Sequence, residues 1–405
     1  MQVKCVGASP ADHNSGSNGF KFRSSRQSYR NLQWSADGTC LLATSYNHSI
    51  DTYVVTVNLL EERDLPHRLD AYSSLTSPDP VNAVIGYPFF SLQDPTSTLL
   101  LSSQRHHPVR LCSALTGERV ASYAIINTLT EEYICPNSLV FSSTGQHFIA
   151  GSESLISIFD ISSPGQEPLA TVQTGPKRVK DDRWNPSTSI RGIVSSLAIE
   201  PSSKVLAAGT FTRQIGLYEA EGQGSCIGAF TVTGNDADTN IGGGGITQLN
   251  WSPCGRYLYI AERKSDGIML YDIRQTGQLL SWCEGRNANT NQRLGFDITT
   301  NGESSHEVWA GGKDGVVRIW KDVHMSEGGV AATFCLDAHD GNIPAFVRDS
   351  QLIKLQTPSL ELLFTDLEAL LQHALARTTS RRKRSRQPGM EAPLNLLARS
   401  RSGHC

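Results

Sequence analysis

The chain has 405 residues, of which 39% are hydrophobic, and a formal net charge of −3. This length suits one large repeat domain with tails, and the slightly negative charge means that any nucleic-acid binding would need a local basic patch. Nine cysteines without a Cys-x-x-Cys pair indicate reduced intracellular thiols. No window of about 18 apolar residues is present, so no membrane span is expected.

From the N-terminus, residues 1–22 are polar and include Ser9-Pro10 and Asn18-Gly19, which predicts a disordered arm. A pattern of short apolar strands and turns then recurs between residues 31 and 335. Its third strands begin near positions 50, 109, 156, 215, 268 and 317, and the clearest copy covers residues 310–322. A spacing of roughly fifty residues is typical of the repeats that build β-propellers.

Each repeat contains the signals for four antiparallel strands, which together make a propeller blade. Asp37-Gly38 and Cys254-Gly255 supply turn chemistry, because glycine adopts positive φ readily. Aromatic residues alternate along the strands and are expected in the core: Trp34, Phe141, Tyr218, Trp251, Tyr271 and Trp320. Three longer polar connections, at about 61–80, 174–190 and 233–245, are expected to be surface loops.

The repeat pattern stops after Gly341. We therefore expect an all-β propeller over residues 23–345 with seven blades, of which six are legible and the seventh is incomplete or divergent. Residues 346–405 form a different tail, with an amphipathic helix predicted at 359–376 and a basic run at 381–386.

Signatures of catalysis are missing from the sequence, including His-Glu-x-x-His, Gly-x-Ser-x-Gly and a phosphate-binding Walker loop. His106 and His107 are adjacent and would point to opposite faces of a strand, which disfavours a metal site. We therefore expect that the protein is not an enzyme and that it binds no cofactor, metal ion or small-molecule substrate.

RNA binding has a more concrete basis. In a propeller the turns between second and third strands converge on one face, where cations would hold phosphates and rings would stack on unpaired bases. The candidate residues in these turns and in the connection before the sixth unit are Arg105, His106, Phe211, Arg213, Arg263, Lys264, Asn291, Gln292, Arg293 and Lys313. The alternative for each one alone is a solvated surface side chain.

The repeats resemble WD40 repeats, and five segments are similar to the telomerase Cajal body protein family. These segments are residues 102–110, 115–123, 209–218, 272–277 and 290–297. The run Thr290-Asn291-Gln292-Arg293 discriminates best, because blade packing does not need it. The resemblance covers roughly residues 28–325 and points to a fungal relative with a divergent C-terminus.

The resemblance implies a seven-bladed nuclear propeller that binds small RNAs of the Cajal body class through a short box in an RNA loop. Telomerase RNA is one such RNA in animals, and fungal relatives are tied to spliceosomal small nuclear ribonucleoproteins. The implied partners are small nuclear or Cajal body RNA and the proteins of its ribonucleoprotein.

We therefore expect a monomeric, non-catalytic scaffold that binds such RNA and assists ribonucleoprotein assembly or localisation. The location would be nuclear, with a cytoplasmic pool left open. Arg381, Arg382, Lys383 and Arg384 are candidates for a nuclear import signal. The alternatives are a protein–protein adaptor, such as a substrate receptor of a ubiquitin ligase, and a splicing-linked factor of small nuclear ribonucleoproteins.

Overall fold

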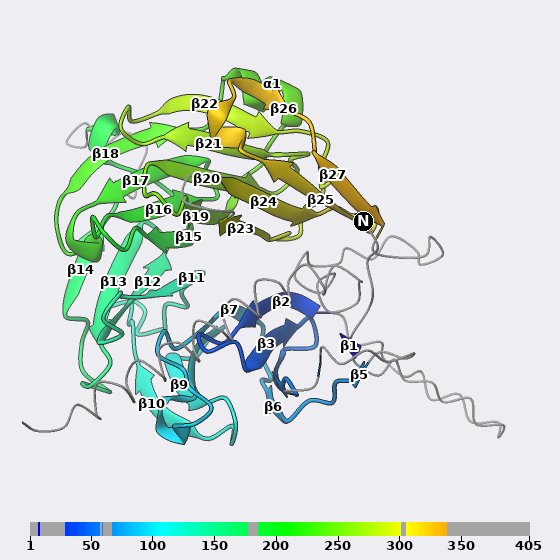
Figure 1. Cartoon of the computed structure of the whole chain (residues 1–405). Coiled ribbons are helices and arrows are strands. Elements are labelled where there is room, and N and C mark those ends of the chain that lie inside the picture. The colour runs from blue at the N-terminus through cyan, green and yellow to red at the C-terminus, as the bar shows by residue number, and fades with distance from the viewer. Residues whose placement is uncertain are drawn as a thin grey trace, which may run out of the picture.

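The computed structural model describes residues 7–8, 29–56, 59, 67–176, 185–300 and 305–337. Six antiparallel sheets follow one another in an arc around a central axis (Figure 1). The four strands of each sheet follow the chain from the axis to the rim. This is a β-propeller of six blades, which confirms the all-β propeller and the six units expected from the sequence.

Blade 1 consists of β2 (Tyr29–Trp34), β3 (Cys40–Ser45), β4 (Ser49–Val54) and β6 (Ser73–Thr76). Blade 2 consists of β7 (Val81–Gly86), β8 (Leu99–Gln104), β9 (Val109–Ser113) and β10 (Arg119–Tyr123). Blade 3 consists of β11 (Ser138–Phe141), β12 (His147–Ser152), β13 (Leu155–Asp160) and β14 (Ala170–Gln173). Blade 4 consists of β15 (Val194–Ile199), β16 (Leu206–Thr210), β17 (Gln214–Tyr218) and β18 (Cys226–Thr231). Blade 5 consists of β19 (Ile246–Trp251), β20 (Tyr257–Glu262), β21 (Ile268–Asp272) and β22 (Gln278–Cys283). Blade 6 consists of β23 (Phe296–Thr300), β24 (His306–Gly311), β25 (Val316–Lys321) and β27 (Phe334–Asp337).

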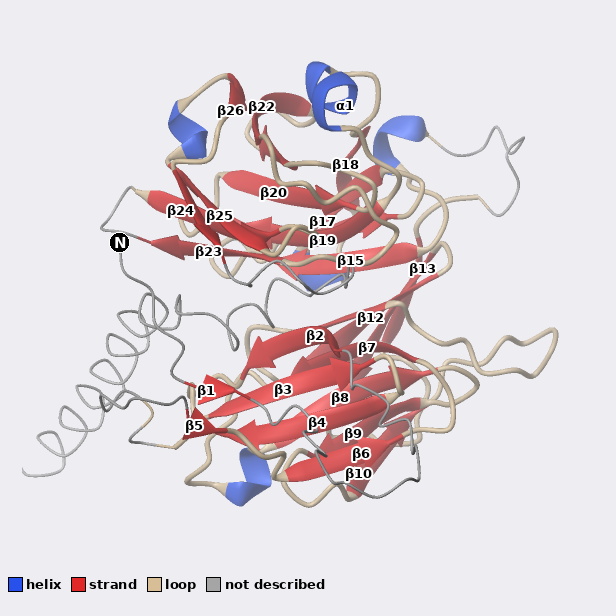
Figure 2. Ribbon diagram, turned by 90° about the vertical axis from the view of Figure 1, so that its right-hand side faces the viewer, coloured by secondary structure: helices blue, strands red, loops and turns tan. Residues whose placement is uncertain are grey.

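The remaining elements are short. β1 (Gly7–Ala8) pairs in parallel with β5 (His67–Arg68), beside the first blade (Figure 2). One α-helix, α1 (Asp236–Ile241), precedes blade 5, within a connection expected to be a surface loop. The 3₁₀ turns are η1 (Pro95–Ser97), η2 (Pro186–Thr188), η3 (Ala220–Gly222) and η4 (Val323–Met325).

The innermost strands pack on one another in sequence, from β2 to β7, β11, β15, β19 and finally β23. Within the described residues this series does not continue from β23 back to β2, and no seventh blade is formed there. Figures 1 and 2 both place the first and last blades on either side of the same gap in the arc. The predicted tail, with its helix at 359–376 and Arg381, Arg382, Lys383 and Arg384, lies outside the described residues.

The last strands connect two blades. After β25, the chain returns to blade 5, where β26 (Gly328–Val330) pairs in parallel with β22. It then moves back to blade 6, where β27 pairs antiparallel with β25. The fifth strand of blade 5 and the fourth strand of blade 6 therefore come from one ten-residue stretch, 328–337.

The turn glycines behave as the sequence predicts. Gly38, Gly145 and Gly255 have φ of 69°, 69° and 71° in the turns between first and second strands. At Gly255 a Cβ would lie 2.7 Å from Glu200 Oε1, so this turn also needs glycine for close approach.

The predicted core aromatics pack in the cores of the blades and, except for Trp34, between neighbouring blades. Phe141, Tyr218, Tyr271 and Trp320 are buried, while Trp34 and Trp251 are half-buried against core clusters. The fully buried Trp320 on β25 donates its Nε1–H to the backbone oxygen of Glu284, 3.2 Å away and just after blade 5.

We predict that Trp320→Ala lowers the free energy of unfolding by about 3–5 kcal/mol, because it opens a cavity in the core and removes a link between two blades. Urea titration monitored by circular dichroism would measure the loss. Tyr72→Ala is the matched control, since Tyr72 is 65% exposed, and it should change stability by less than about 0.5 kcal/mol. Equal losses in the two variants would contradict the assignment of Trp320 to the core.

Candidate nucleic-acid interface

One end of the blades carries all ten sequence-predicted residues. Because the strands alternate in direction, the turns between second and third strands share this end with the connections between blades. The turns hold Arg105 and His106 in blade 2, Phe211 and Arg213 in blade 4, Arg263 and Lys264 in blade 5, and Lys313 in blade 6, while Asn291, Gln292 and Arg293 lie between β22 and β23. We call this end of the molecule the loop face.

The connection from β22 to β23 is fastened to neighbouring turns. Lys264 N–H donates to Thr290 O at 2.7 Å, and Lys313 N–H donates to Asn287 O at 2.9 Å. Beneath it, the buried Arg286 donates to the backbone oxygens of Gly311, Leu294 and Gly295. The fastening holds the turns of blades 5 and 6 against the segment that carries Arg293.

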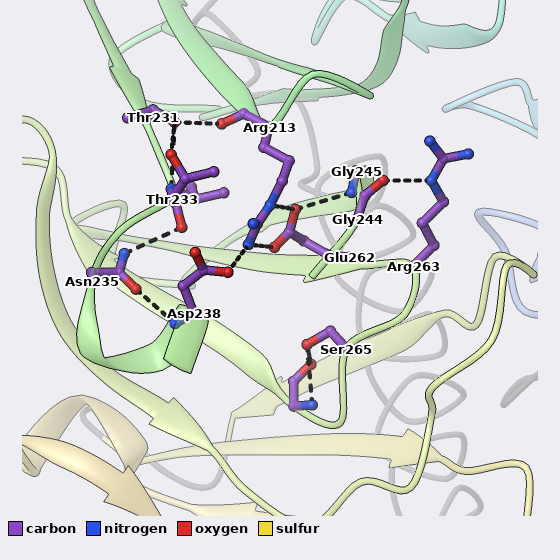
Figure 3. Close-up of polar contacts among 12 residues, drawn as sticks. Arg213, Thr231, Thr233, Asn235, Asp238, Gly244, Gly245, Glu262, Arg263 and Ser265 are labelled. Carbon is purple, nitrogen blue, oxygen red and sulfur yellow. Dashed lines mark hydrogen bonds and ion pairs between the residues drawn. The ribbon is translucent and has the colours of Figure 1, made fainter. Parts of the chain in front are cut away.

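Arg213 is occupied by carboxylates of its own chain. Its Nε and Nη2 donate to the two oxygens of Glu262 at 2.8 and 2.7 Å, and Nη2 lies 2.6 Å from Asp238 Oδ1 (Figure 3). The Glu262 side chain is 1% exposed. Burial would raise the pKa of Asp238, but hydrogen bonds from Arg213 and Gly234 outweigh it and lower that pKa. Arg213 therefore joins blade 4 to blade 5 and α1, and its contact with RNA stays a prediction.

The glycine run before β19 makes room for this ion pair. A Cβ on Gly243 would lie 2.0 Å from Glu262 Oε2 and 2.3 Å from Arg213 Nη2. Asn235 caps α1 by accepting the Asp238 N–H at 2.8 Å, which positions the Asp238 carboxylate (Figure 3). The connection is thus built around Arg213.

We predict that Arg213→Met destabilises the protein by about 3–5 kcal/mol, because it leaves the Glu262 carboxylate buried without its cation. The double variant Arg213→Met with Glu262→Met should be much less destabilised, because both charges are gone. Thermal and urea unfolding of the two variants would measure this. Additive losses in the double variant would show that the pair is not coupled.

Two other arginines share one aromatic ring. The guanidinium carbons of Arg263 and Arg293 lie over the Phe211 ring, 4.7 and 5.4 Å from its centroid. Arg263 Nε donates to Gly244 O at 2.6 Å (Figure 3), and Arg293 Nη1 donates to Asn137 O at 3.2 Å. Phe211 thus holds two cations near each other through cation–π contacts. Its predicted role as a base platform stays a prediction.

A third arginine completes a group that we call the arginine cluster: Arg30, Arg263 and Arg293. Burial, with the positive charges of Arg30 and Arg263, lowers the pKa of Arg293 to about 10. Arg293 still carries its charge at neutral pH, so like charges are held together at a cost in free energy. Arg30 was missed in the sequence because it precedes the first legible strand of its repeat, which begins at Leu32.

The arginine cluster adjoins the central channel of the propeller. The channel is a cavity of about 320 Å³ lined by the innermost strands of blades 1 to 5 and by residues 293–295. Arg30 and Arg293 are the charged residues of this lining, and no described residue of the lining is acidic. The other polar groups there are amides and hydroxyls, so the channel favours an anion over a cation.

The remaining predicted side chains are spread around the loop face. Arg105, His106, Lys264, Asn291 and Lys313 are exposed. Gln292 is partly buried, and its Oε1 has no donor among the described residues. The structure therefore brings Phe211, Arg263 and Arg293 into contact, holds Arg213 in its ion pairs with Glu262 and Asp238, and leaves the other six residues apart from these two groups on the loop face.

A backbone feature recurs in these turns. In every blade one residue of the turn between second and third strands has φ between 50° and 77°: His48, His106, Ser154, Arg213, Lys264 and Gly315. Left-handed backbone is costly for residues with a side chain, and glycine would adopt it most easily. Four of the six turns nevertheless place a histidine, arginine or lysine there.

The described residues contain no group of three or more His, Cys, Asp and Glu side chains placed to hold a metal ion. No helix among them is long and apolar enough to cross a membrane.

A propeller of four-stranded repeat blades is an architecture that WD40-repeat proteins have. The chain is 31% identical over 303 residues to guanine nucleotide-binding protein negative regulator 1 of Schizosaccharomyces pombe, covering 74% of this chain and 72% of that relative. It is 29% identical over 295 residues to telomerase Cajal body protein 1 of Mus musculus and 28% identical over 295 residues to that of Homo sapiens.

Those matches cover 72% of this chain, and the chain spans about half the length of the mammalian relatives. No family model matches the chain. On these similarities the chain belongs to the family of telomerase Cajal body protein 1 and its fission yeast relative, as the segments in the sequence indicated.

Proposed function

We propose that this propeller is a non-catalytic scaffold that binds small nuclear or Cajal body-class RNA through its loop face and assists ribonucleoprotein assembly or localisation in the nucleus. The names of the mammalian relatives, which join telomerase to the Cajal body, support the RNA class and the nuclear location. Telomerase RNA is one candidate among such RNAs.

The arginine cluster is the observation that carries the proposal. Three like charges are held close by the Phe211 ring and by backbone oxygens, beside a channel whose described lining offers no carboxylate. An RNA phosphate would relieve this repulsion, because charge-assisted hydrogen bonds to arginine are among the strongest in proteins.

The left-handed turns support the same face. Histidine, arginine or lysine at a position where glycine would cost least indicates that the side chain has a role that offsets the cost of the left-handed backbone. Arg213 has such a role in its ion pair with Glu262. For the exposed His106 and Lys264, contact with RNA would supply it.

We predict that the triple reversal Arg105→Glu, Lys264→Glu and Lys313→Glu weakens RNA binding at least tenfold, because three exposed cations of the loop face are lost. The plot of log K against log salt should become shallower by about 2, as expected for three phosphate contacts on single-stranded RNA. Filter binding with a small Cajal body RNA and with a spliceosomal small nuclear RNA would measure both effects. Thermal unfolding should not change.

The matched control reverses three exposed cations at the other end of the blades: Arg119→Glu, Arg256→Glu and Arg274→Glu. Arg256 lies in the turn between β19 and β20, Arg274 lies in the turn between β21 and β22, and Arg119 is the first residue of β10. The same change in net charge should there cost little affinity. Equal losses of RNA affinity in the two triple variants would show that only the net charge matters, and would contradict RNA binding by the loop face.

We also predict that Lys264→Gly separates stability from binding. Its φ of 56° favours glycine, so the free energy of unfolding should stay the same or rise by up to about 1 kcal/mol. RNA affinity should fall at the same time. Calorimetry and filter binding on one preparation would test this, and a loss of stability without a loss of affinity would oppose the functional explanation.

A protein–protein adaptor is the second candidate, favoured by the name of the fission yeast relative, guanine nucleotide-binding protein negative regulator 1. Crosslinking in cells followed by sequencing of bound RNA separates the two. An adaptor would recover no RNA above background, whereas the proposed scaffold would recover spliceosomal, Cajal body or telomerase RNA.

A further inference from the structure

The innermost strands share an irregularity where they meet the loop face. In four blades the pairing of the first two strands shifts by one residue, between Tyr29 and Asn31, Val81 and Ala83, Val194 and Ser196, and Ile246 and Gln248. The extra residues are Arg30, Asn82, Ser195 and Thr247, and all four line the channel. β-Bulges re-aim side chains in this way next to functional sites.

Some channel groups already have structural partners. Ser138 Oγ donates to Val194 O at 2.8 Å, Ser195 Oγ donates to Ile246 O at 2.6 Å, and the Gln248 amide bonds both backbone groups of Phe296. These groups join neighbouring blades, so they are engaged within the ring.

Two amides of β2 are different. The half-buried Asn31 side chain lines the channel and makes no hydrogen bond within the described part of the chain, and Gln33 Nε2 has no acceptor there. Both follow Arg30 on the same strand, so the strand offers a cation at the channel mouth and then amide donors and acceptors further along. An amide can pair with the edge of a nucleobase, and a guanidinium can bind a phosphate or stack on a base.

We propose that the channel mouth takes one unpaired nucleotide, with its phosphate against Arg263 and Arg293 and its base directed towards Asn31 and Gln33. This inference rests on the proposed function when the nucleotide belongs to an RNA, but the same chemistry would also take a free nucleotide. The cavity of about 320 Å³ lies at the small end of ligand pockets, so it suits a single nucleotide rather than a run of bases.

Phe211 has a defined part in this arrangement. Its ring is already engaged by two guanidinium groups, so the phosphate of the entering nucleotide would meet those groups and not the ring. Arg263 approaches from the turn of blade 5, beside the Arg213–Glu262 ion pair that fixes that turn (Figure 3). Phe211 is therefore a positioning residue for the two arginines.

The test uses the full-length protein and an RNA hairpin with a small Cajal body RNA loop, in which each loop nucleotide in turn is made abasic. We expect one position at which loss of the base weakens binding at least tenfold. The variant Asn31→Leu with Gln33→Leu should bind the intact loop at least tenfold more weakly and should be insensitive to the abasic change at that position. Asn289→Leu, an exposed amide of the loop face outside the channel lining, is the matched control and should behave like the unaltered protein.

A second measurement needs no variant. RNA carrying 4-thiouridine in the loop should photo-crosslink to the peptide that contains Asn31 and Gln33. Crosslinks confined to the peptides of Arg105, Lys264 and Lys313 would overturn the channel site while leaving RNA binding by the loop face in place. Equal losses of affinity at all abasic positions would have the same meaning.

The third arm uses free nucleoside 5′-monophosphates and measures their binding by the shift in melting temperature, with Arg293→Gln for comparison. Binding of free nucleotides that Arg293→Gln abolishes, together with no binding of RNA, would keep the channel site and overturn the proposed function. Binding of neither RNA nor free nucleotides would overturn both.

Discussion

Hydrogen bonds between innermost strands are the interaction on which this propeller depends. A side chain from one blade reaches the backbone of the next, as Ser138 does with Val194 and Ser195 with Ile246. At the first junction the donor is Arg30, whose Nη1 lies 2.6 Å from Val81 O. Each such bond joins a side chain of one blade to a backbone carbonyl of the next, and its loss would cost free energy where water is excluded.

The use of arginine at one junction gives the channel its charge. A serine at that place would only donate a hydrogen bond to the carbonyl oxygen. Arg30 donates this bond and also brings a positive charge that helps to lower the pKa of Arg293. The same network therefore holds the blades in register and sets the electrostatic character of the channel. The Arg213–Glu262 pair acts similarly near the loop face, between blades 4 and 5.

The sequence predicts the blades because period-two apolar strands and glycine turns are local signals. It also predicts the face on which Phe211, Arg263 and Arg293 meet, because strand alternation alone decides it. Two features lay outside its reach. The partner of Arg213 is Glu262, 49 positions away on another blade, and no local pattern pairs them. Arg30 faces the channel through a bulge, and a shift of one residue in pairing leaves no trace in the order of apolar residues.

The crossing of the chain between the last two blades has a consequence for cooperativity. Repeat proteins commonly behave as a row of units, each coupled only to its neighbour and able to open at either end. Here β26, which follows β25 of blade 6 in the chain, pairs with β22 at the edge of blade 5, and β27 then pairs with β25 in blade 6. Because one stretch supplies the outer edge of both blades, we expect blades 5 and 6 to open together and to exchange their amide hydrogens as one unit. The segment that carries Arg293 connects these two blades, so its position depends on both of them staying closed.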